Sequence, residues 1–197
     1  IFEKLKNNGT TLEEKMIESI VYSLTILDEV KNILIFVNGE LLTALNDGTI
    51  LPNPLNRNFG INKVYDIEKI KNTTKVTIYY ISKYHDYYYY VPVTKISNEP
   101  GNKMEIIINE LKSSPVRETN LMSYLASNLE LLNYELLEQK INLSFNKYLL
   151  DDFNDKNILE EVKYTIGLSV MENFNVKEIN FFVDNEKVLD ILTKNLE

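Results

Sequence analysis

The stretch Val30-Lys-Asn-Ile-Leu-Ile-Phe-Val-Asn-Gly-Glu40 has a related copy later in this chain, where residues 176–186 read Val-Lys-Glu-Ile-Asn-Phe-Phe-Val-Asp-Asn-Glu. Without gaps, residues 147–186 align with residues 1–40 at ten identical positions. The matches follow one order: a helix start, an apolar helix, a short linker and an apolar strand. The repeat predicts two copies of one small α+β module, and we expect most of the upstream half of the first copy to lie outside this chain.

Upstream of that stretch, the sequence predicts a helix over residues 10–27. Thr10 and Thr11, each followed three positions later by Glu13 or Glu14, are capping-box candidates. Apolar side chains then recur at helical spacing: Met16, Ile17, Ile20, Val21 and Leu24. We therefore expect one apolar face that packs on a sheet.

Residues 33–37 are a continuous apolar run and predict a strand. Asn38-Gly39 follows, the pair best suited to a two-residue hairpin turn with both residues at positive φ, and residues 40–45 would return as the partner strand. Residues 46–62 contain Gly and Pro and predict a loop that closes the module.

The second module opens with a predicted hairpin over residues 75–82 and 87–95, which are rich in Tyr, Val, Ile and Thr. Pro92 cannot donate to a β-ladder, so its strand is expected at an edge or with a bulge. A helix over residues 104–111 should end before Pro115.

Later in this module, residues 129–137 have helical propensity, and the choice between helix and strand is open on propensity alone. Asn157 with Glu160 should cap the second copy of the repeated helix, and residues 176–183 are the second copy of the strand.

Composition narrows the class of protein. Of 197 residues, 44% are hydrophobic and 25% charged, as in ordinary globular proteins, and the net charge is −8. An acidic surface repels phosphate backbones, so we expect no nucleic-acid partner. The absence of cysteine excludes disulfides and thiolate metal sites, and the single histidine excludes a His-based metal cluster.

Taken together, these patterns predict an α+β fold of tandem modules, each with helices on one face of a mixed or antiparallel sheet. The first module with its connector covers residues 1–70, and the second covers residues 71–197. No run of eighteen apolar residues predicts a membrane span. The chain opens on Ile1 with no signal peptide or lipobox, so we expect any targeting segment upstream.

The order of these motifs resembles the GerMN module of sporulation and spore-germination proteins, the GerM family. The resemblance is carried by residues 20–25 with residues 30–40, by the Gly-containing loop that closes on Pro54-Leu-Asn-Arg57, and by residues 76–80 with residues 90–95. Ile141-Asn-Leu-Ser144 resembles the family's strand before the second helix. This correspondence favours a strand hairpin, over residues 129–137 and 140–144, in the open stretch. Asn185 departs from the Gly that the family favours.

The resemblance implies a non-enzymatic, extracytoplasmic, lipid-anchored protein of a spore-forming bacterium, with its anchor outside this chain. It also implies kinship with ring-building motifs. We therefore expect an interaction and assembly module for an envelope complex around the developing spore, with sporulation envelope proteins or further copies as partners. The alternative is a small-molecule or cell-wall ligand-binding module. We expect no cofactor and no metal.

Tyrosines crowd the predicted hairpin, and strand alternation separates them into two faces. If Val91 and Val93 face the core, then an outward set remains: Tyr79, Ile81, Tyr88 and Tyr90. These four residues are the candidate interaction surface, because tyrosine is enriched at binding surfaces. Cross-strand aromatic pairing that only stabilises the hairpin is the other interpretation.

Other candidate sites have simpler interpretations. His85-Asp86 falls at the predicted hairpin turn, where Asp is favoured for backbone hydrogen bonding. The acidic pairs Glu13-Glu14 and Glu160-Glu161 open the repeated helices, where carboxylates complement the positive helix end. Asp151-Asp152 is interpreted as a solvated surface, since the calcium-loop pattern of Gly and Glu is missing there.

Overall fold

A computed structural model describes residues 10–68, 71–113, 120–152 and 154–196. The chain divides into two compact units, Ile1–Lys63 and Val64–Glu197. The division falls between Lys63 and Val64 rather than near residue 70. The reason is that β3 (Val64–Asp66) pairs in parallel with a strand of the second unit.

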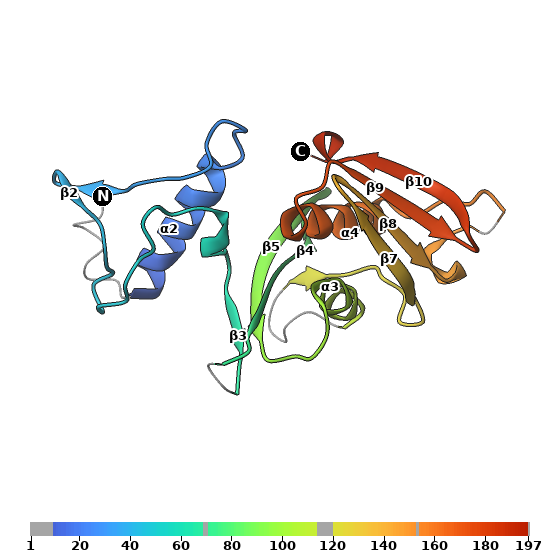
Figure 1. The fold of residues 1–197 in the computed structure, drawn as a ribbon, viewed down its shortest axis with the longest axis horizontal. Coiled ribbons are helices and arrows are strands. Elements are labelled where there is room, and N and C mark those ends of the chain that lie inside the picture. The colour runs from blue at the N-terminus through green and yellow to red at the C-terminus, as the bar shows by residue number, and fades with distance from the viewer. Residues whose placement is uncertain (1–9, 69–70, 114–119, 153, 197) are drawn as a thin grey trace. The chain divides into compact units, whose positions relative to one another are not determined.

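Within residues 10–63, the first unit contains one helix and a short hairpin (Figure 1): α2 (Thr10–Leu24), β1 (Phe36–Val37), β2 (Glu40–Leu41) and the 3₁₀ turn η1 (Arg57–Phe59). The predicted helix is confirmed, although it ends at Leu24. Ile17 and Val21 of its apolar face are fully buried, whereas Leu24 at its end is exposed. The small core also contains Tyr22, Ile33, Ile35, Leu45, Leu51 and Leu55.

The turn after β1 has the predicted geometry. Asn38 and Gly39 both have positive φ, of 54° and 87°, and they join Val37 to Glu40 across a two-residue turn. The strand over residues 33–37 is shorter than predicted, because only Phe36 and Val37 form a ladder. Ile33 instead forms an isolated bridge with Leu55 of the closing loop.

Glu13 lies in the first turn of α2, where a carboxylate complements the positive helix end as predicted, but it is not solvated. Glu13 is buried and accepts a hydrogen bond from the backbone N–H of Asn46, at 3.0 Å. Glu14 pairs with Lys63 at 2.8 Å. These carboxylates hold the closing loop and the end of the unit onto the helix, and the side chains of Thr10 and Thr11 lie outside the described residues.

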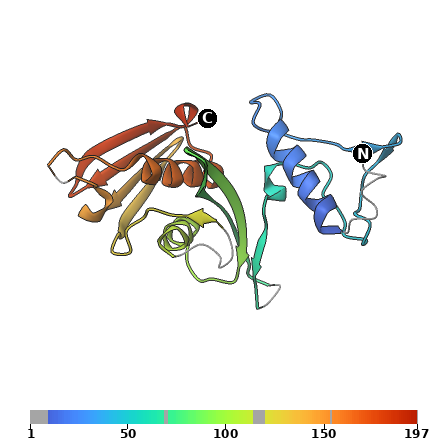
Figure 2. The ribbon, with the colours of Figure 1, turned by 180° about the vertical axis from the view of Figure 1, so that it is seen from behind.

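In the part of the second unit that the structure describes, there are two four-stranded sheets and two helices (Figures 1 and 2). One sheet has the order β3-β5-β4-β6, with β4 (Thr74–Tyr84), β5 (Tyr87–Ser97) and β6 (Leu121–Met122). The other has the order β10-β9-β8-β7, with β7 (Leu131–Leu137), β8 (Lys140–Phe145), β9 (Glu178–Val183) and β10 (Glu186–Leu192). The helices are α3 (Lys103–Lys112) and α4 (Glu160–Asn173), and the 3₁₀ turns are η2 (Lys147–Leu149) and η3 (Thr193–Asn195).

Both sheets share one hydrophobic core. Strands β8 and β9 supply fully buried side chains at alternate positions, Ile141, Leu143 and Phe145 on one and Ile179 and Phe181 on the other. The helices add further buried residues: Met104, Ile107 and Leu111 from α3, and Val162, Ile166 and Val170 from α4. The predicted α+β class is therefore confirmed, with mixed sheets, because β3–β5 and β8–β9 are the parallel pairs.

The second unit confirms the predicted β4–β5 hairpin, the helix before Pro115 and the strands β7 and β8. The predicted cap of α4 is wrong. Its N-cap residue is Leu159, with no side-chain hydrogen bond, and Asn157 forms a bridge with Asp152 instead. A capping box that sequence reasoning missed opens α3, where Asn102 and Glu105 exchange hydrogen bonds.

None of the helices in the described ranges combines the length and the apolar character that crossing a bilayer requires.

Candidate functional site

The ladder between β4 and β5 places the four predicted surface residues on one face, as alternation predicted. Tyr79 lies opposite Pro92, and Ile81 lies opposite Tyr90. Tyr88 follows on the same face, opposite Lys83. The expectation that all four face solvent is wrong, however, because Tyr79 is 8% exposed and Ile81 is fully buried.

Helix α4 covers the inner half of this face. The Ser169 hydroxyl accepts a hydrogen bond from the backbone N–H of Tyr79 at 2.9 Å, and the Tyr79 hydroxyl donates to Glu172 at 3.2 Å. The Asn173 amide accepts from the N–H of Thr77 at 3.1 Å and donates to its carbonyl at 2.6 Å. Polar side chains of α4 thus satisfy backbone groups of β4 as a neighbouring strand would.

Tyr90 lies at the border between the covered and the open half. Its ring stacks on Tyr164 of α4, with centroids 5.2 Å apart, and the Lys163 ammonium lies over the Tyr164 ring at 4.7 Å. Burial, followed by the negative charges of Glu161 and Glu160, raises the pKa of Tyr90 to about 12. The phenol is therefore neutral at physiological pH.

The exposed tyrosines gather beyond this border, at the end of the hairpin. Tyr84, Tyr87 and Tyr89 are 66%, 70% and 50% exposed, and Tyr88 is exposed on the opposite face. The predicted turn at His85-Asp86 is confirmed, because Tyr84 pairs with Tyr87 and His85 has a φ of 54°. The His85 ring contacts Tyr84 edge-on, with centroids 4.3 Å apart.

A small hollow lies next to the hairpin. It encloses about 160 Å³, and its lining includes Tyr124, Tyr148, Leu159 and Val162. A hydrogen bond between the side chains of Tyr124 and Tyr88, together with the nearby charge of Tyr88, raises the pKa of Tyr124. Tyr124 of the hollow therefore contacts Tyr88 of the hairpin. We define the tyrosine surface by its exposed members: Tyr84, Tyr87, Tyr88, Tyr89, Tyr124 and Tyr148.

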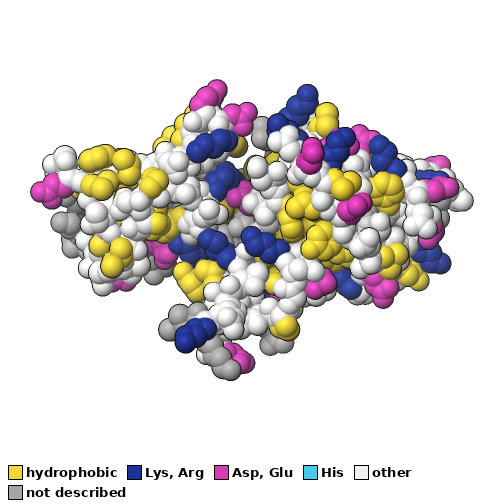
Figure 3. Space-filling view, viewed as in Figure 1, with side chains coloured by type: hydrophobic (Ala, Val, Ile, Leu, Met, Phe, Trp, Pro, Cys, Tyr) yellow, Lys and Arg dark blue, Asp and Glu magenta, His cyan; other side chains and the backbone are white. Residues whose placement is uncertain are grey.

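Hydrophobic side chains gather on the near face of the second unit in the space-filling view, where α4 and the strands β4 and β6 lie in Figure 1 (Figure 3). Strand alternation cannot reveal the contribution of Tyr124 and Tyr148, because both come from segments outside the hairpin. Their high exposure as large aromatic side chains is the signal that identifies them.

The base of the hairpin is held by a charge network on its other face, in which Lys95 and Glu110 are partly buried and Asp66 is exposed. Lys95 contacts Glu110 of α3 at 2.5 Å and Asp66 of β3 at 3.2 Å. Burial opposes the charge of Lys95, but the hydrogen bond and charge of Glu110, with Asp66 and Glu99, hold its pKa above its usual range. Burial and Glu110 also raise the pKa of Tyr80, whose hydroxyl donates to that carboxylate. This network anchors the hairpin to α3.

The edge of β5 agrees with the prediction from Pro92. Among the described strands, β3 pairs with β5 only over Lys95–Ser97, whereas β4 pairs with it along its whole length.

Over the residues that the structure describes, no group of three or more His, Asp or Glu side chains lies close enough to hold a metal ion. Exposed aromatic side chains thus lie on a hairpin whose base is held by the ion pairs of Lys95, and this arrangement is suited to contact with another molecule.

Comparison with known proteins adds independent information. No family model matches the chain. The chain is 27% identical over 192 residues to the spore germination protein GerM of Bacillus subtilis (strain 168). That match covers 94% of this chain and 52% of the relative, so the chain spans about half of the relative's length.

The structure is also similar to a solved structure, the tandem GerMN domains of the sporulation protein GerM from Bacillus subtilis. The TM-score is 0.82 at 27% sequence identity, and the match covers 93% of this chain and 65% of the solved one. The similarity in fold and the similarity in sequence thus extend over nearly the same share of the chain.

Proposed function

We propose that this chain, which belongs to the GerM family of GerMN-domain sporulation and germination proteins, is a non-enzymatic docking module. It would assemble an envelope complex around the developing spore. Its partner would be a sporulation envelope protein or a further copy of itself.

The observation that carries the proposal is the tyrosine surface. Tyrosine supplies a large apolar ring with a polar end, and it is over-represented among the residues that dominate binding energy. Several such side chains lie exposed on one hairpin and beside one hollow. Surfaces of monomeric proteins expose large contiguous apolar patches mainly where another molecule binds.

The geometry suggests how docking would occur. An apolar side chain of the partner would enter the hollow beside Tyr124 and contact Tyr88. Tyr84, Tyr87 and Tyr89, on the other face of the hairpin, would contact a second part of the partner. Glu160 and Glu161 lie close enough to Tyr90 to raise its pKa, and the Lys163 ammonium lies over the neighbouring Tyr164 ring, so the border of the surface carries both signs of charge. A partner with basic and acidic residues around an apolar anchor would match these charges.

The location of the protein is part of the same proposal. It would act outside the cytoplasm and be held to the membrane by a lipid anchor. Docking at an envelope requires the module to face the intermembrane space around the spore. The family's role in sporulation and germination supports this placement.

Affinity capture from sporulating cells tests the proposal. The intact, membrane-anchored protein would be cross-linked and its partners identified by mass spectrometry. The double variant Tyr87→Ser/Tyr89→Ser should lose at least tenfold of the captured partner, because both side chains are exposed and neither contributes to the core. Tyr65→Ser is the matched control, since Tyr65 is a similarly exposed tyrosine on β3 of the same unit. Equal capture by both variants would exclude the tyrosine surface.

The alternative function, small-molecule or cell-wall ligand binding, is favoured by a different observation. A polar hollow lies on the outer face of the sheet formed by β7 to β10. Amide, carboxylate and hydroxyl side chains and one phenylalanine line it.

A further inference from the structure

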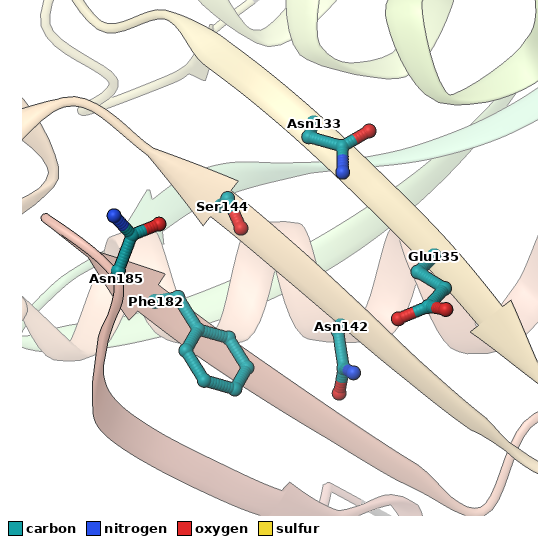
Figure 4. A pocket seen from close by; sticks show the side chains of 6 residues that line it. All are labelled: Asn133, Glu135, Asn142, Ser144, Phe182 and Asn185. Atoms are coloured by element: carbon teal, nitrogen blue, oxygen red, sulfur yellow. The ribbon is translucent and has the colours of Figure 1, made fainter.

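The second hollow lies on the sheet formed by β7, β8, β9 and β10. It is a shallow hollow, open to solvent, with a volume of about 230 Å³, and it is lined by Asn133, Glu135, Asn142, Ser144, Phe182 and Asn185. Figure 4 shows these side chains on three neighbouring strands and on the turn after β9, with α4 behind the sheet. The buried residues alternate with them along β8, so the hollow lies on the face away from the core.

Strand register brings the lining residues together. Asn133 lies opposite Ser144 and Glu135 lies opposite Asn142 in the β7–β8 ladder. In the β8–β9 ladder, Asn142 lies beside Asn180 and Ser144 lies beside Phe182. Residues that are far apart in sequence thus form one continuous polar surface around a single aromatic ring.

Asn180 lies beside this surface, next to Asn142 in the β8–β9 ladder. It is 7% exposed, and its Nδ2 donates to Asn142 and to Glu178, both at 3.1 Å. Its Oδ1 is buried and has no hydrogen-bond partner among the described residues. Polar atoms in this position are uncommon in folded proteins and call for a specific explanation.

The hydrogen bonds of Asn180 fix the orientation of its neighbours. Glu178 can only accept, so Asn180 must direct its Nδ2 toward it. Lys140 pairs with this carboxylate at 2.7 Å, and the hydrogen bonds of Lys140 and Asn180 lower the pKa of Glu178. Asn142 accepts from Asn180 through Oδ1. Its own Nδ2 group is therefore not used in this hydrogen bond, and the side chain lines the hollow.

The repeat shows that the amide of Asn180 belongs to the second module alone. In the alignment of residues 147–186 with residues 1–40, Asn180 corresponds to Leu34 and Phe182 corresponds to Phe36. The aromatic ring is kept, whereas the amide is replaced by an aliphatic side chain. The amide surface is not required for the module to form its strand and turn.

We propose that this hollow binds a neutral saccharide. Amide, hydroxyl and carboxylate groups supply the mixture of donors and acceptors that sugar hydroxyls need. Phe182 supplies a flat apolar surface for the C–H face of a sugar ring. No Lys or Arg lines the hollow, which disfavours phosphate and other anions. The volume lies below the roughly 300–1,000 Å³ of pockets for drug-sized ligands, so one sugar ring fits the hollow, with any further rings outside it.

The roles follow from position. Phe182 would stack on the ring, Asn142 would donate to a hydroxyl or an acetamido oxygen, and Glu135 would accept from a hydroxyl. The site is separate from the tyrosine surface and does not rest on the docking proposal.

Titration of the chain with two probes tests this inference. N-acetylglucosamine represents a free sugar, and chitotetraose represents a neutral glycan chain; both would be followed by calorimetry and by NMR of the backbone amides. We expect saturable binding, with shifts at Asn142, Asn180 and Phe182. Equal affinities per site would identify a free-sugar site, whereas tighter binding of chitotetraose would identify a glycan site.

Variants distinguish this site from general adhesion. Phe182→Leu and Asn142→Ala should each weaken binding at least tenfold. Asn175→Ala should leave it unchanged, because Asn175 is an exposed amide outside the hollow. Absence of saturable binding of either probe, or NMR shifts confined to other residues, would overturn the proposal even if a variant failed to fold. Tyr87→Ser/Tyr89→Ser should keep sugar binding, so failure of the docking proposal remains distinguishable.

Discussion

At the scale of single residues, Asn173 has an unusual structural role. Its amide hydrogen bonds both backbone groups of Thr77 and also the carbonyl of Ser169 within α4. In the sequence, Asn173 is only a polar residue at the end of a helix. The role depends on a strand about a hundred positions away, so no local pattern could predict it.

We expect Asn173→Ala to destabilise the second unit by about 1–3 kcal/mol, because it leaves backbone groups of Thr77 without partners near the core. Urea unfolding followed by circular dichroism measures the change. Asn175→Ala, two positions later and exposed, should change stability by less than about 0.5 kcal/mol. Equal midpoints for the two variants would refute the role of Asn173.

Tyrosine ionisation gives a prediction for alkaline pH. Burial and nearby carboxylates raise the pKa of Tyr90 to about 12 and also raise that of Tyr80. Each phenol has a higher pKa when folded than its unfolded value of about 10. The stability that this linkage provides is therefore complete below pH of about 10 and is lost as pH rises toward about 12.

Stability should accordingly fall between those two pH values, and Tyr90→Phe should make that fall shallower because it removes one of the two groups. Chemical denaturation at a series of pH values measures the slope. Tyr87→Phe serves as the control, since Tyr87 is highly exposed. A slope that Tyr90→Phe leaves unchanged would show that this phenol is not linked to folding.

At the scale of elements, the sequence predicted which residues share a face but not what covers that face. Alternation placed Tyr79, Ile81, Tyr88 and Tyr90 together correctly, because side chains of a strand alternate by geometry alone. The cover is α4, which is contributed by a segment some eighty positions later. Burial is a property of tertiary packing, and local periodicity carries no information about it.

The stretch that became β7 shows the same competition between local and tertiary effects. Its leucines and glutamates favour a helix by propensity, yet residues 131–137 form a strand paired with β8. Pairing with β8, whose apolar residues are buried, outweighs a weak preference summed over seven residues. Resemblance to the GerMN family predicted this strand, whereas propensity did not.

The repeated turn gives a prediction at this scale. Gly39 has a φ of 87° with open space where a Cβ would lie, and its counterpart Asn185 has a φ of 64°. Gly39→Ala should destabilise the first unit by about 1–2 kcal/mol, because a Cβ is disfavoured in the left-handed region. Gly39→Asn should cost less, since Asn tolerates this region. Thermal unfolding compares the two, and equal losses would contradict the explanation.

At the scale of the whole molecule, the chain contains two separate hydrophobic cores, one in each compact unit. Sequence analysis predicted two modules from the repeat, and the structure has two units. The repeat could not place their border to the residue, because pairing of β3 with β5 depends on contacts about thirty residues apart.

Separate cores predict separate losses of stability. Leu55→Ala should destabilise the first unit by about 2–5 kcal/mol and Ile141→Ala the second by a similar amount, because both side chains are almost completely buried. Native-state hydrogen exchange reports each unit separately. Loss of protection in both units from either variant would indicate one cooperative core instead.

The docking proposal is tested most directly by photo-cross-linking in sporulating cells. A photoreactive amino acid would be placed at position 87 in the exposed hairpin, and at position 65 on β3 as the matched control. The proposal predicts a discrete cross-linked product with an envelope protein or a second copy from position 87 and none from position 65. Absence of any product at position 87, in cells where the protein is present and folded, would contradict it.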